Sequence, residues 1–287
     1  MGVDAGGSKC SARLADASGH IIGRGLSGPA NINTGIGNVF STILEATSQA
    51  ISEAKLDTQA IPTIRASIGV AGIGREGAKA ALQAQEFPFH STNIYTDGFI
   101  ANTGAHSGAD GGIVIIGTGS IAIGRLGGKN IRIGGYGFPI SDEGSGAYIG
   151  LRAIRITLRA SDGRILHSDL TRQLFQKFGR KTHGIIAWMD KATAADYAVL
   201  APIVVEAAEA GDRQGRMIIR HAANHIDLMV CGLYKSGVPR CALLGGLAPK
   251  IKPWLSPDTS AKLVKPDGDA LDGALWLARQ GLKENRG

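Results

Sequence analysis

The chain has 287 residues, which is enough for two domains of ordinary size or for one large domain. Hydrophobic residues make up 44% of it and charged residues 19%, as in an ordinary soluble globular enzyme. The net charge of +7 suits a polyanionic ligand such as ATP, but no five like charges stand together and aromatic residues make up only 5%, so we expect no nucleic-acid binding.

Three cysteines without a CxxC pair indicate a reducing compartment. The apolar runs are too short to span a bilayer and the N-terminus lacks a signal-peptide pattern, so we expect a cytoplasmic protein without membrane contact.

The first half of the chain has the pattern of an α/β unit with a mixed sheet. Only three residues precede Asp4, whereas a core strand usually has about five, so we expect either a short first strand or a chain that begins upstream. The expected elements are a hairpin over 1–14, a third strand at Ile21 and Ile22, a loop over 28–33, a helix over 38–54, a strand over 66–71, a helix over 76–85 and a strand over 94–96.

The pattern restarts at Gly111, which predicts a second α/β domain. We expect a first domain over 1–107 and a second over 108–274, with the C-terminal helix, about 275–287, packing back on the first. The expected elements of the second half are strands over 113–116, 121–125 and 131–134, a helix over 147–158, a mostly helical region over 159–240 with its clearest helices over 197–210 and 215–234, a strand over 242–244 and a closing helix over 271–279.

Each half begins with an apolar strand that runs into a glycine turn with a hydroxyl residue. The first turn holds Gly6, Gly7, Ser8 and Lys9, and the second holds Gly117, Thr118, Gly119 and Ser120. Glycines let backbone N–H groups close on a phosphate, and a hydroxyl adds a donor. The pair of turns therefore predicts a nucleotide held between two similar halves. The first turn is not a P-loop, and a solvated Lys9 is the simpler interpretation of that side chain, although it can also neutralise a phosphate.

Two aspartates stand at predicted strand ends. Asp4 precedes the first glycine turn, where a carboxylate can hold the waters of a Mg²⁺ bound to phosphates or can cap its own turn. Asp97 ends the strand over 94–96, where it can accept a proton from a substrate hydroxyl or cap a helix that starts near Phe99. The two glycine turns together favour a role of Asp4 in holding Mg²⁺, whereas the local pattern around Asp97 slightly favours a helix cap.

Two further segments carry glycines in unusual density. Residues 134–139 (GGYGFP) combine glycines and aromatics, which favours a ligand platform, and residues 141–146 (SDEGSG) place two acids before a helix, where they can cap the helix or bind sugar hydroxyls. Residues 72–77 match the GxGxxG dinucleotide fingerprint, but that fingerprint leaves the two similar turns unexplained.

Together and in this order, these pieces resemble the actin/hexokinase/Hsp70 ATPase superfamily. More narrowly, they resemble its BadF/BadG/BcrA/BcrD branch, which contains N-acetylglucosamine kinases and bacterial glucosamine kinases. Residues 4–9 resemble the first phosphate motif, with Ala5 and Ser8 as departures from its usual DGGGT, and residues 117–120 resemble the second. Gly245 and Gly246 resemble the start of the adenosine motif. The resemblance implies two ribonuclease H-like domains with a nucleotide cleft between them.

The resemblance also implies a set of sugar-side residues. Asn31 takes the place of the family's sugar-binding asparagine, Asp97 matches the catalytic base, and Gly72 falls in another sugar-facing turn. Gly135, Tyr136 and Gly137 resemble the family's GGWG loop, with Tyr for Trp. Asp142 matches the sugar-binding aspartate of its DEGS motif.

These residues imply an ATP-dependent kinase with Mg²⁺ as cofactor. ATP and an amino sugar, N-acetylglucosamine or glucosamine, would be its partners, and Asp97 would deprotonate the 6-hydroxyl that attacks the γ-phosphate. The resemblance is compatible with a homodimer. Two alternatives stay open: an activator ATPase of a 2-hydroxyacyl-CoA dehydratase, which would need cluster-binding cysteines, and a non-catalytic sugar sensor, which would bind sugar without releasing ADP.

Overall fold

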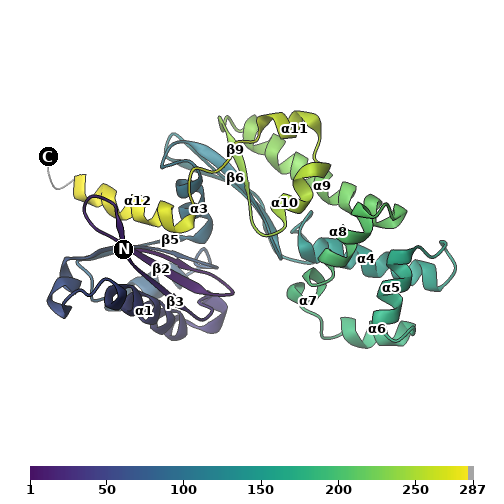
Figure 1. The fold of residues 1–287 in the computed structure, drawn as a ribbon, viewed down its shortest axis with the longest axis horizontal. Helices are drawn as coiled ribbons and strands as arrows, with labels where there is room; N and C mark the ends of the chain where they lie inside the picture. Colours follow the sequence, from purple (N-terminus) through teal and green to yellow (C-terminus); the bar gives the residue numbers. More distant parts are fainter. Residues whose placement is uncertain (284–287) are drawn as a thin grey trace. The chain divides into compact units, whose positions relative to one another are not determined.

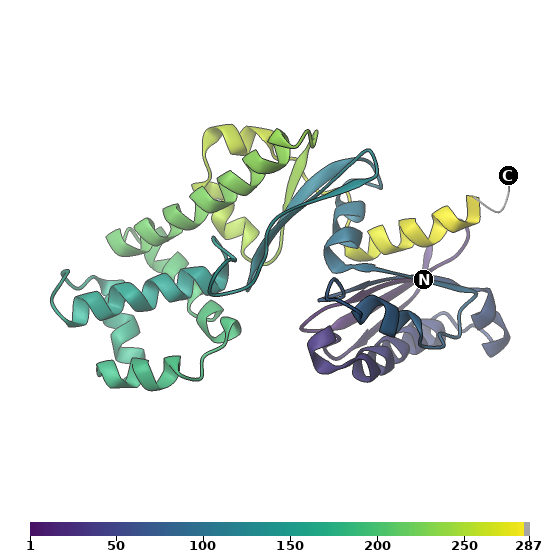
Figure 2. The same ribbon diagram turned by 180° about the vertical axis from the view of Figure 1, so that it is seen from behind.

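The computed structural model describes residues 1–283, so the last four residues of the helix expected over 275–287 lie outside it. The described chain forms two compact units (Figures 1 and 2). One contains Met1–Asp110 together with the segment that starts at Lys265, and the other contains Gly111–Val264. Each unit has its own mixed sheet, as predicted, and its own hydrophobic core.

The sheet of the first unit has the strand order β3-β2-β1-β4-β5. Its strands are β1 (Gly2–Ala5), β2 (Cys10–Ala15), β3 (Ile21–Ser27), β4 (Arg65–Val70) and β5 (Ser91–Thr96). β1 pairs antiparallel with β2 and parallel with β4, and β4 pairs parallel with β5. β3 is antiparallel to β2 and therefore runs in the direction of β1. The carboxyl ends of β1, β3, β4 and β5 consequently share one edge of the sheet.

Helices cover both faces of this sheet (Figures 1 and 2). α1 (Ile36–Glu53) packs on β2 and β3, where a side-chain carbon at Gly25 would lie 1.8 Å from the carbonyl oxygen of Ala46. α3 (Asp97–Ala105) and α12 (Ala270–Lys283) pack together on the other face. The short elements are η1 (Ile32–Thr34), η2 (Thr58–Thr63) and α2 (Ala78–Gln83).

Two glycines allow α3 and α12 to approach closely. A side-chain carbon at Gly104 would lie 1.8 Å from the carbonyl oxygen of Asp269, and one at Gly273 would lie 1.9 Å from that of Ile100. Side-chain carbons never come so close to oxygen, so these positions accept only glycine unless the helices separate. Because α3 begins at Asp97, this contact also supports the residue predicted as the base.

The sheet of the second unit repeats the pattern of the first, with the order β8-β7-β6-β9. Its strands are β6 (Gly111–Ile116), β7 (Ser120–Leu126), β8 (Lys129–Gly134) and β9 (Cys241–Leu244). β6 pairs antiparallel with β7 and parallel with β9, as β1 does with β2 and β4. In both units a glycine turn therefore joins the first strand to an antiparallel second strand.

The remainder of the second unit is mostly helical, as predicted. Its helices are α4 (Gly146–Ser161), α5 (Asp169–Lys177), α6 (Thr182–Met189), α7 (Ala194–Ala198), α8 (Ala201–Glu209), α9 (Arg213–Lys235), α10 (Ala248–Ile251), η3 (Lys252–Trp254) and α11 (Pro257–Lys262). The single helix predicted over 197–210 is wrong: α7 ends and α8 begins inside it. Pro202 lies in the first turn of α8, and proline cannot donate the backbone hydrogen bond that would continue a helix through this point. Over residues 1–283, no helix is both long and apolar enough to cross a bilayer.

Candidate active site

The first glycine turn joins β1 to β2 at the shared edge of the first sheet. Its backbone is closed by a hydrogen bond from the Gly6 N–H to the Lys9 carbonyl oxygen, 3.0 Å long. Gly7, Ser8 and Lys9 are exposed. Within residues 1–283 the Ser8 hydroxyl and the Lys9 ammonium have no hydrogen-bond partner, so both can meet a ligand.

Asn31 connects this turn to the loop after β4. The Ala30 N–H donates to the Gly6 carbonyl oxygen at 2.9 Å, and Asn31 forms an isolated parallel bridge with Ala71. Its Oδ1 accepts from the Asn33 N–H at 2.9 Å and lies 3.3 Å from where a side-chain carbon at Gly72 would stand. Asn31 and Gly72, which sequence reasoning placed in the same site from positions 41 residues apart, are thus neighbours.

Asp97 follows β5 at the same edge, because Thr96 pairs with Val70 in the parallel register of β4 and β5. The Thr96 hydroxyl, not Asp97, caps α3 by accepting from the Phe99 N–H at 3.1 Å. The Asp97 carboxylate accepts a hydrogen bond from the Gly98 N–H at 2.8 Å. The cap reading suggested by the local pattern is therefore wrong, and the Asp97 carboxylate retains free acceptor positions.

Electrostatics distinguish the two strand-end aspartates from ordinary surface carboxylates. Burial within the surrounding protein raises the pKa of Asp97, although its side chain retains solvent access. Burial also raises the pKa of Asp4 to about 6, with further contributions from the charges of Asp97 and Asp269, while Lys9 lowers it. Among the described residues no group of three or more His, Cys, Asp or Glu side chains could hold a metal ion by itself. A single carboxylate such as Asp4 suits Mg²⁺, which takes its other ligands from water and phosphate.

The second glycine turn lies against the first turn of α4 and is hydrogen-bonded to it. The N–H groups of Gly146 and Ala147, at the start of α4, donate to the carbonyl oxygens of Gly117 and Thr118 at 2.8 and 3.1 Å. Thr118 is exposed, and no partner for its hydroxyl occurs within the described chain. Ser120 is buried and its hydroxyl donates to the Glu143 carbonyl oxygen at 2.7 Å, so this hydroxyl already has a structural role.

The loop after β9 lies against the same turn. Gly245 has φ = +95°, and a side-chain carbon there would lie 2.3 Å from the Ile116 carbonyl oxygen, which excludes any larger residue. The Leu247 N–H donates to that same oxygen at 3.1 Å. Gly246 is exposed with open space around it. The structure thus brings together the two predicted nucleotide segments of the second unit.

The glycine-rich loop that follows β8 presents an aromatic ring. Tyr136 is 73% exposed, and the Arg132 guanidinium lies 4.8 Å from the centre of its ring. Arg132 also donates to the carbonyl oxygens of Gly134 and Gly135. Sequence reasoning missed Arg132, although its position two residues before the loop was a usable signal, because a cation held over a ring fixes the ring's orientation.

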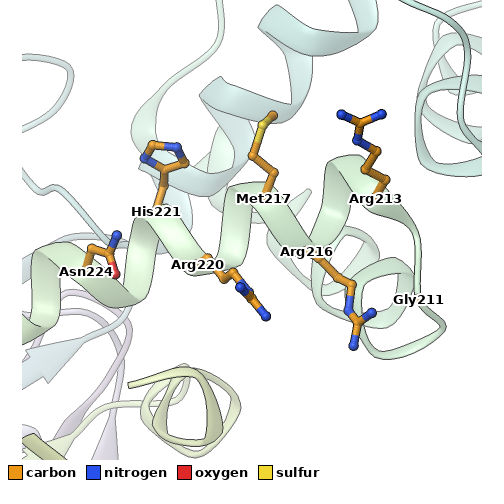
Figure 3. A pocket seen from close by; sticks show the side chains of 7 residues that line it. All are labelled: Gly211, Arg213, Arg216, Met217, Arg220, His221 and Asn224. Atoms are coloured by element: carbon orange, nitrogen blue, oxygen red, sulfur yellow. The ribbon is translucent and has the colours of Figure 1, made fainter. Parts of the chain in front are cut away.

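A separate pocket of about 430 Å³ runs along the N-terminal half of α9. In Figure 3 the side chains of Arg213, Met217 and His221 extend from one side of the helix, and those of Arg216 and Arg220 from the other. None of the predicted site residues lines this pocket. Within the described chain the three arginines have no carboxylate partner, so they contribute positive potential to the second unit.

Two mixed sheets of matching topology, each with a glycine turn after its first strand, define the actin-like ATPase fold class that the sequence predicted. Solved structures of the same fold agree: a ROK family glucokinase from Streptomyces griseus, 19% identical, has a TM-score of 0.56 with coverage of 98% of this chain and 99% of its own. The chain belongs to the BadF/BadG/BcrA/BcrD ATPase family, whose model matches residues 1–265.

Named relatives are similar to the chain over at least four-fifths of both lengths. The glucosamine kinase GspK of Vibrio cholerae is 36% identical over 278 residues, which cover 97% of this chain and 95% of that protein. The N-acetyl-D-glucosamine kinase of Dictyostelium discoideum is 30% identical over 84% of this chain and 81% of its own. The crystal structure of a Chromobacterium violaceum protein, assigned as a candidate N-acetylglucosamine kinase, is 33% identical with a TM-score of 0.87 and covers 96% of this chain and 97% of that one.

Proposed function

We propose that this protein is an ATP-dependent amino-sugar kinase that transfers the γ-phosphoryl group of ATP to the 6-hydroxyl of glucosamine or N-acetylglucosamine. The observation that carries the proposal is the state of Asp97: its carboxylate stands at the sheet edge beside the Asn31 and Gly72 loops and is not needed as a helix cap. The names of the relatives, a glucosamine kinase and an N-acetylglucosamine kinase, support the same substrate class.

In this proposal Asp97 is the general base. Its carboxylate accepts the proton of the 6-hydroxyl as the sugar oxygen forms a bond to the γ-phosphorus and the bond from that phosphorus to the β,γ-bridging oxygen breaks, releasing ADP. A raised pKa makes the carboxylate a stronger base than an ordinary aspartate. Its remaining hydrogen bond, from the Gly98 N–H, fixes the orientation of the side chain.

The two glycine turns are the proposed nucleotide-binding elements. The exposed Thr118 hydroxyl and the Gly119 N–H would hold phosphate oxygens in the second unit, where the Gly117 N–H closes the turn by donating to the Gly119 carbonyl oxygen at 2.9 Å. Gly245 and Gly246 would lie along the adenosine. In the first unit Gly7 and Ser8 would donate to phosphate and the Lys9 ammonium would offset its charge, while Gly6 closes the turn through its N–H bond to the Lys9 carbonyl oxygen. A terminal phosphate held by several fixed donors is positioned for in-line attack.

Asp4 is the residue proposed to hold Mg²⁺ together with the phosphates. Its carboxylate fits a cation because burial and the charges of Asp97 and Asp269 make an uncompensated negative charge costly there. Mg²⁺ prefers carboxylate oxygen, water and phosphate oxygen as ligands, and one carboxylate is enough when phosphates complete the set. When bound, the ion would neutralise charge that develops on the β- and γ-phosphate oxygens.

The sugar side of the proposal names a set of residues in each unit. Asn31 and Gly72 in the first unit, and Gly135, Tyr136, Gly137 and Asp142 in the second, are the proposed sugar-binding residues. Asn31 has a side-chain Nδ2 with no partner among residues 1–283, and Tyr136 offers an apolar ring edge to the substituent at C2.

The properties of the cysteines weigh against the activator alternative. Iron–sulfur clusters are held by several cysteine thiolates. Cys10 and Cys241 are buried, and Cys231 is the one exposed cysteine among the described residues, so their surface offers a single thiol. The kinase therefore remains the function that the site supports best.

The test is ADP release from Mg-ATP in the presence of glucosamine, N-acetylglucosamine, N-acetylmannosamine or glucose, with a sugar-free control. We expect sugar-dependent ADP release that is fastest with one of the two glucosamine sugars, and a sugar 6-phosphate as product. Sugar binding without ADP release would contradict the proposal in favour of a sensor, and ADP release that ignores sugar would contradict it in favour of an ATPase.

A further inference from the structure

The Asp142 carboxylate lies directly against the second glycine turn. Its Oδ2 is 2.7 Å, and its Cγ 3.1 Å, from the place that a side-chain carbon at Gly119 would occupy. Any residue larger than glycine at position 119 would therefore push this carboxylate away. The contact joins the turn after β6 to a residue 23 positions later, in the segment that leads into α4.

Backbone groups of two loops act on the pKa of this carboxylate. Burial raises the pKa of Asp142, with a further contribution from the charge of Glu143, whereas backbone N–H groups of Gly137 and Phe138 in the glycine-rich loop and of Ser120 in the turn lower it. The ionised carboxylate is therefore stabilised by groups of both loops in a partly desolvated position.

Further bonds extend the same connection. Ser120 donates its hydroxyl to the Glu143 carbonyl oxygen at 2.7 Å, the Ser141 N–H donates to the Gly137 carbonyl oxygen at 2.8 Å, and the Tyr136 N–H donates to the Ser141 hydroxyl at 3.3 Å. The loop that carries Tyr136 is thus connected to the turn through residues 141–143.

Asp142 is not occupied with helix capping. Ser145 caps α4, its hydroxyl accepting from the Tyr148 N–H at 3.2 Å. Asp142 instead has a left-handed backbone, with φ = +65°, which costs energy for a residue other than glycine and is tolerated best by asparagine and aspartate. This backbone directs the carboxylate to its position between the two loops.

We propose that Asp142 is a positioning residue that makes nucleotide and sugar binding cooperative, by joining the phosphate turn over residues 117–120 to the loop over residues 134–141. The inference rests on the proposed function, since it assumes that the turn binds ATP phosphates and that the loop binds the sugar. Because the carboxylate lies against the turn and residues 141–143 are hydrogen-bonded to both segments, a ligand that orders one also orders the other. The second ligand then loses less conformational entropy on binding and binds more tightly.

The test is the affinity of the wild-type protein for glucosamine and for N-acetylglucosamine, measured by calorimetry with and without Mg²⁺ and a non-hydrolysable ATP analogue. We expect the analogue to lower the sugar Kd about fivefold or more, and the sugar to lower the analogue Kd by the same factor. Asp142→Asn retains the size and the left-handed preference of the residue but loses its charge. We expect both ligands still to bind, the sugar more weakly because Asp142 is also a proposed sugar-binding residue, and the factor to fall toward one. A purely structural role would weaken each affinity or lower Tm without changing this ratio.

Two glycine variants test the same contact while Asp142 stays in place. In Gly119→Ala the new carbon would displace the carboxylate, so the factor is expected to fall as in Asp142→Asn. In Gly117→Ala, in the same turn, no heavy atom lies within 4 Å of the new carbon, so the factor should be retained even if nucleotide affinity changes.

The outcomes separate this inference from the proposed function. If neither sugar nor nucleotide binds, the proposed kinase function itself is wrong. If both bind but the wild-type protein shows no cooperativity, or if Asp142→Asn and Gly119→Ala keep the wild-type factor, the coupling role of Asp142 is overturned while the kinase function stands.

Discussion

The Asp97 carboxylate at the end of β5 acts through its charge on the Asp4 carboxylate at the end of β1. Burial is the main reason that the pKa of Asp4 rises to about 6, and the negative charge of Asp97 is the next largest contribution. Asp97 in turn has its own pKa raised by burial. One sheet edge therefore carries two carboxylates whose pKa values are raised. A cation at Asp4 would relieve the repulsion between Asp4 and Asp97 while leaving Asp97 available as a base.

Asp97→Asn is predicted to abolish most sugar phosphorylation. Asparagine retains the size of the side chain but cannot accept the proton, so kcat should fall by about 10²- to 10⁴-fold. Nucleotide affinity should change little, because Asp97 contacts the hydroxyl and not the phosphates in the proposed reaction. Coupled ADP release gives kcat, and calorimetry with a non-hydrolysable ATP analogue gives affinity.

The matched control for this variant is Asp190→Asn. Asp190 follows α6, is exposed, and has no side-chain partner among the described residues, so the same change of charge should leave kcat as in the wild type. Near-normal turnover by Asp97→Asn would exclude Asp97 as the base.

As the pH is lowered, kcat/KM is predicted to begin to fall at a higher pH than it would if the catalytic aspartate had an ordinary pKa. Asp97 must be ionised to accept a proton, and its raised pKa moves the loss of the ionised form upward. Asp4, with a pKa of about 6, must also be ionised to hold Mg²⁺, so kcat/KM should fall as the pH drops through about 6. Because protons and Mg²⁺ compete for Asp4, raising the Mg²⁺ concentration should shift this limb to lower pH. A limb that does not respond to Mg²⁺ would contradict the role of Asp4.

The repeated turns, and with them the fold, could be predicted because their signals are local. The strand before Gly6 and the strand before Gly117 are short apolar runs that end in glycine, and this pattern depends on neighbouring residues alone. Pro202 is an equally local signal, and it favours two helices, α7 and α8, over the single helix expected there.

The electrostatics of the site could not be predicted in the same way. Asp269 contributes to the raised pKa of Asp4 from 265 positions away, and only the packing of α12 on the first sheet brings them near each other. The contact between Asp142 and Gly119 likewise depends on a left-handed backbone that the residue type permits but does not require. The sequence leaves open whether Thr96 or Asp97 caps α3, because both types of side chain can cap a helix.

Gly104→Ala is predicted to destabilise the first unit and to lower activity with it. The added carbon would lie 1.8 Å from the Asp269 carbonyl oxygen, so α3 and α12 would have to separate, at a cost of about 1 to 3 kcal/mol. Since α3 begins at Asp97, its displacement should also reduce kcat.

The control is Gly37→Ala in α1. No heavy atom lies within 4 Å of the added carbon there, so alanine should stabilise the helix by about 0.5 to 1 kcal/mol. Urea unfolding followed by circular dichroism measures both, and equal effects of the two variants would contradict the close helix contact.

Asp4→Asn is predicted to make the protein more stable while making it inactive. At neutral pH the folded state bears the cost of an ionised Asp4 in a desolvated, negatively charged setting, and the unfolded state does not. Because the folded pKa of about 6 lies above the ordinary 3.8, this penalty accumulates as the pH rises from about 4 to 6 and is complete above 6. Asparagine never carries the charge, so the free energy of unfolding should rise by about 1 to 3 kcal/mol above pH 6, and the gain should disappear as the pH falls toward 4.

Asp16→Asn should do the opposite, because the Ser18 hydroxyl and backbone N–H groups lower the pKa of Asp16, so that its ionised form is the stabilising one. Urea titrations of the three proteins across this pH range measure the effect, and an Asp4→Asn gain that did not depend on pH would mean that packing, rather than charge, limits the stability of this edge.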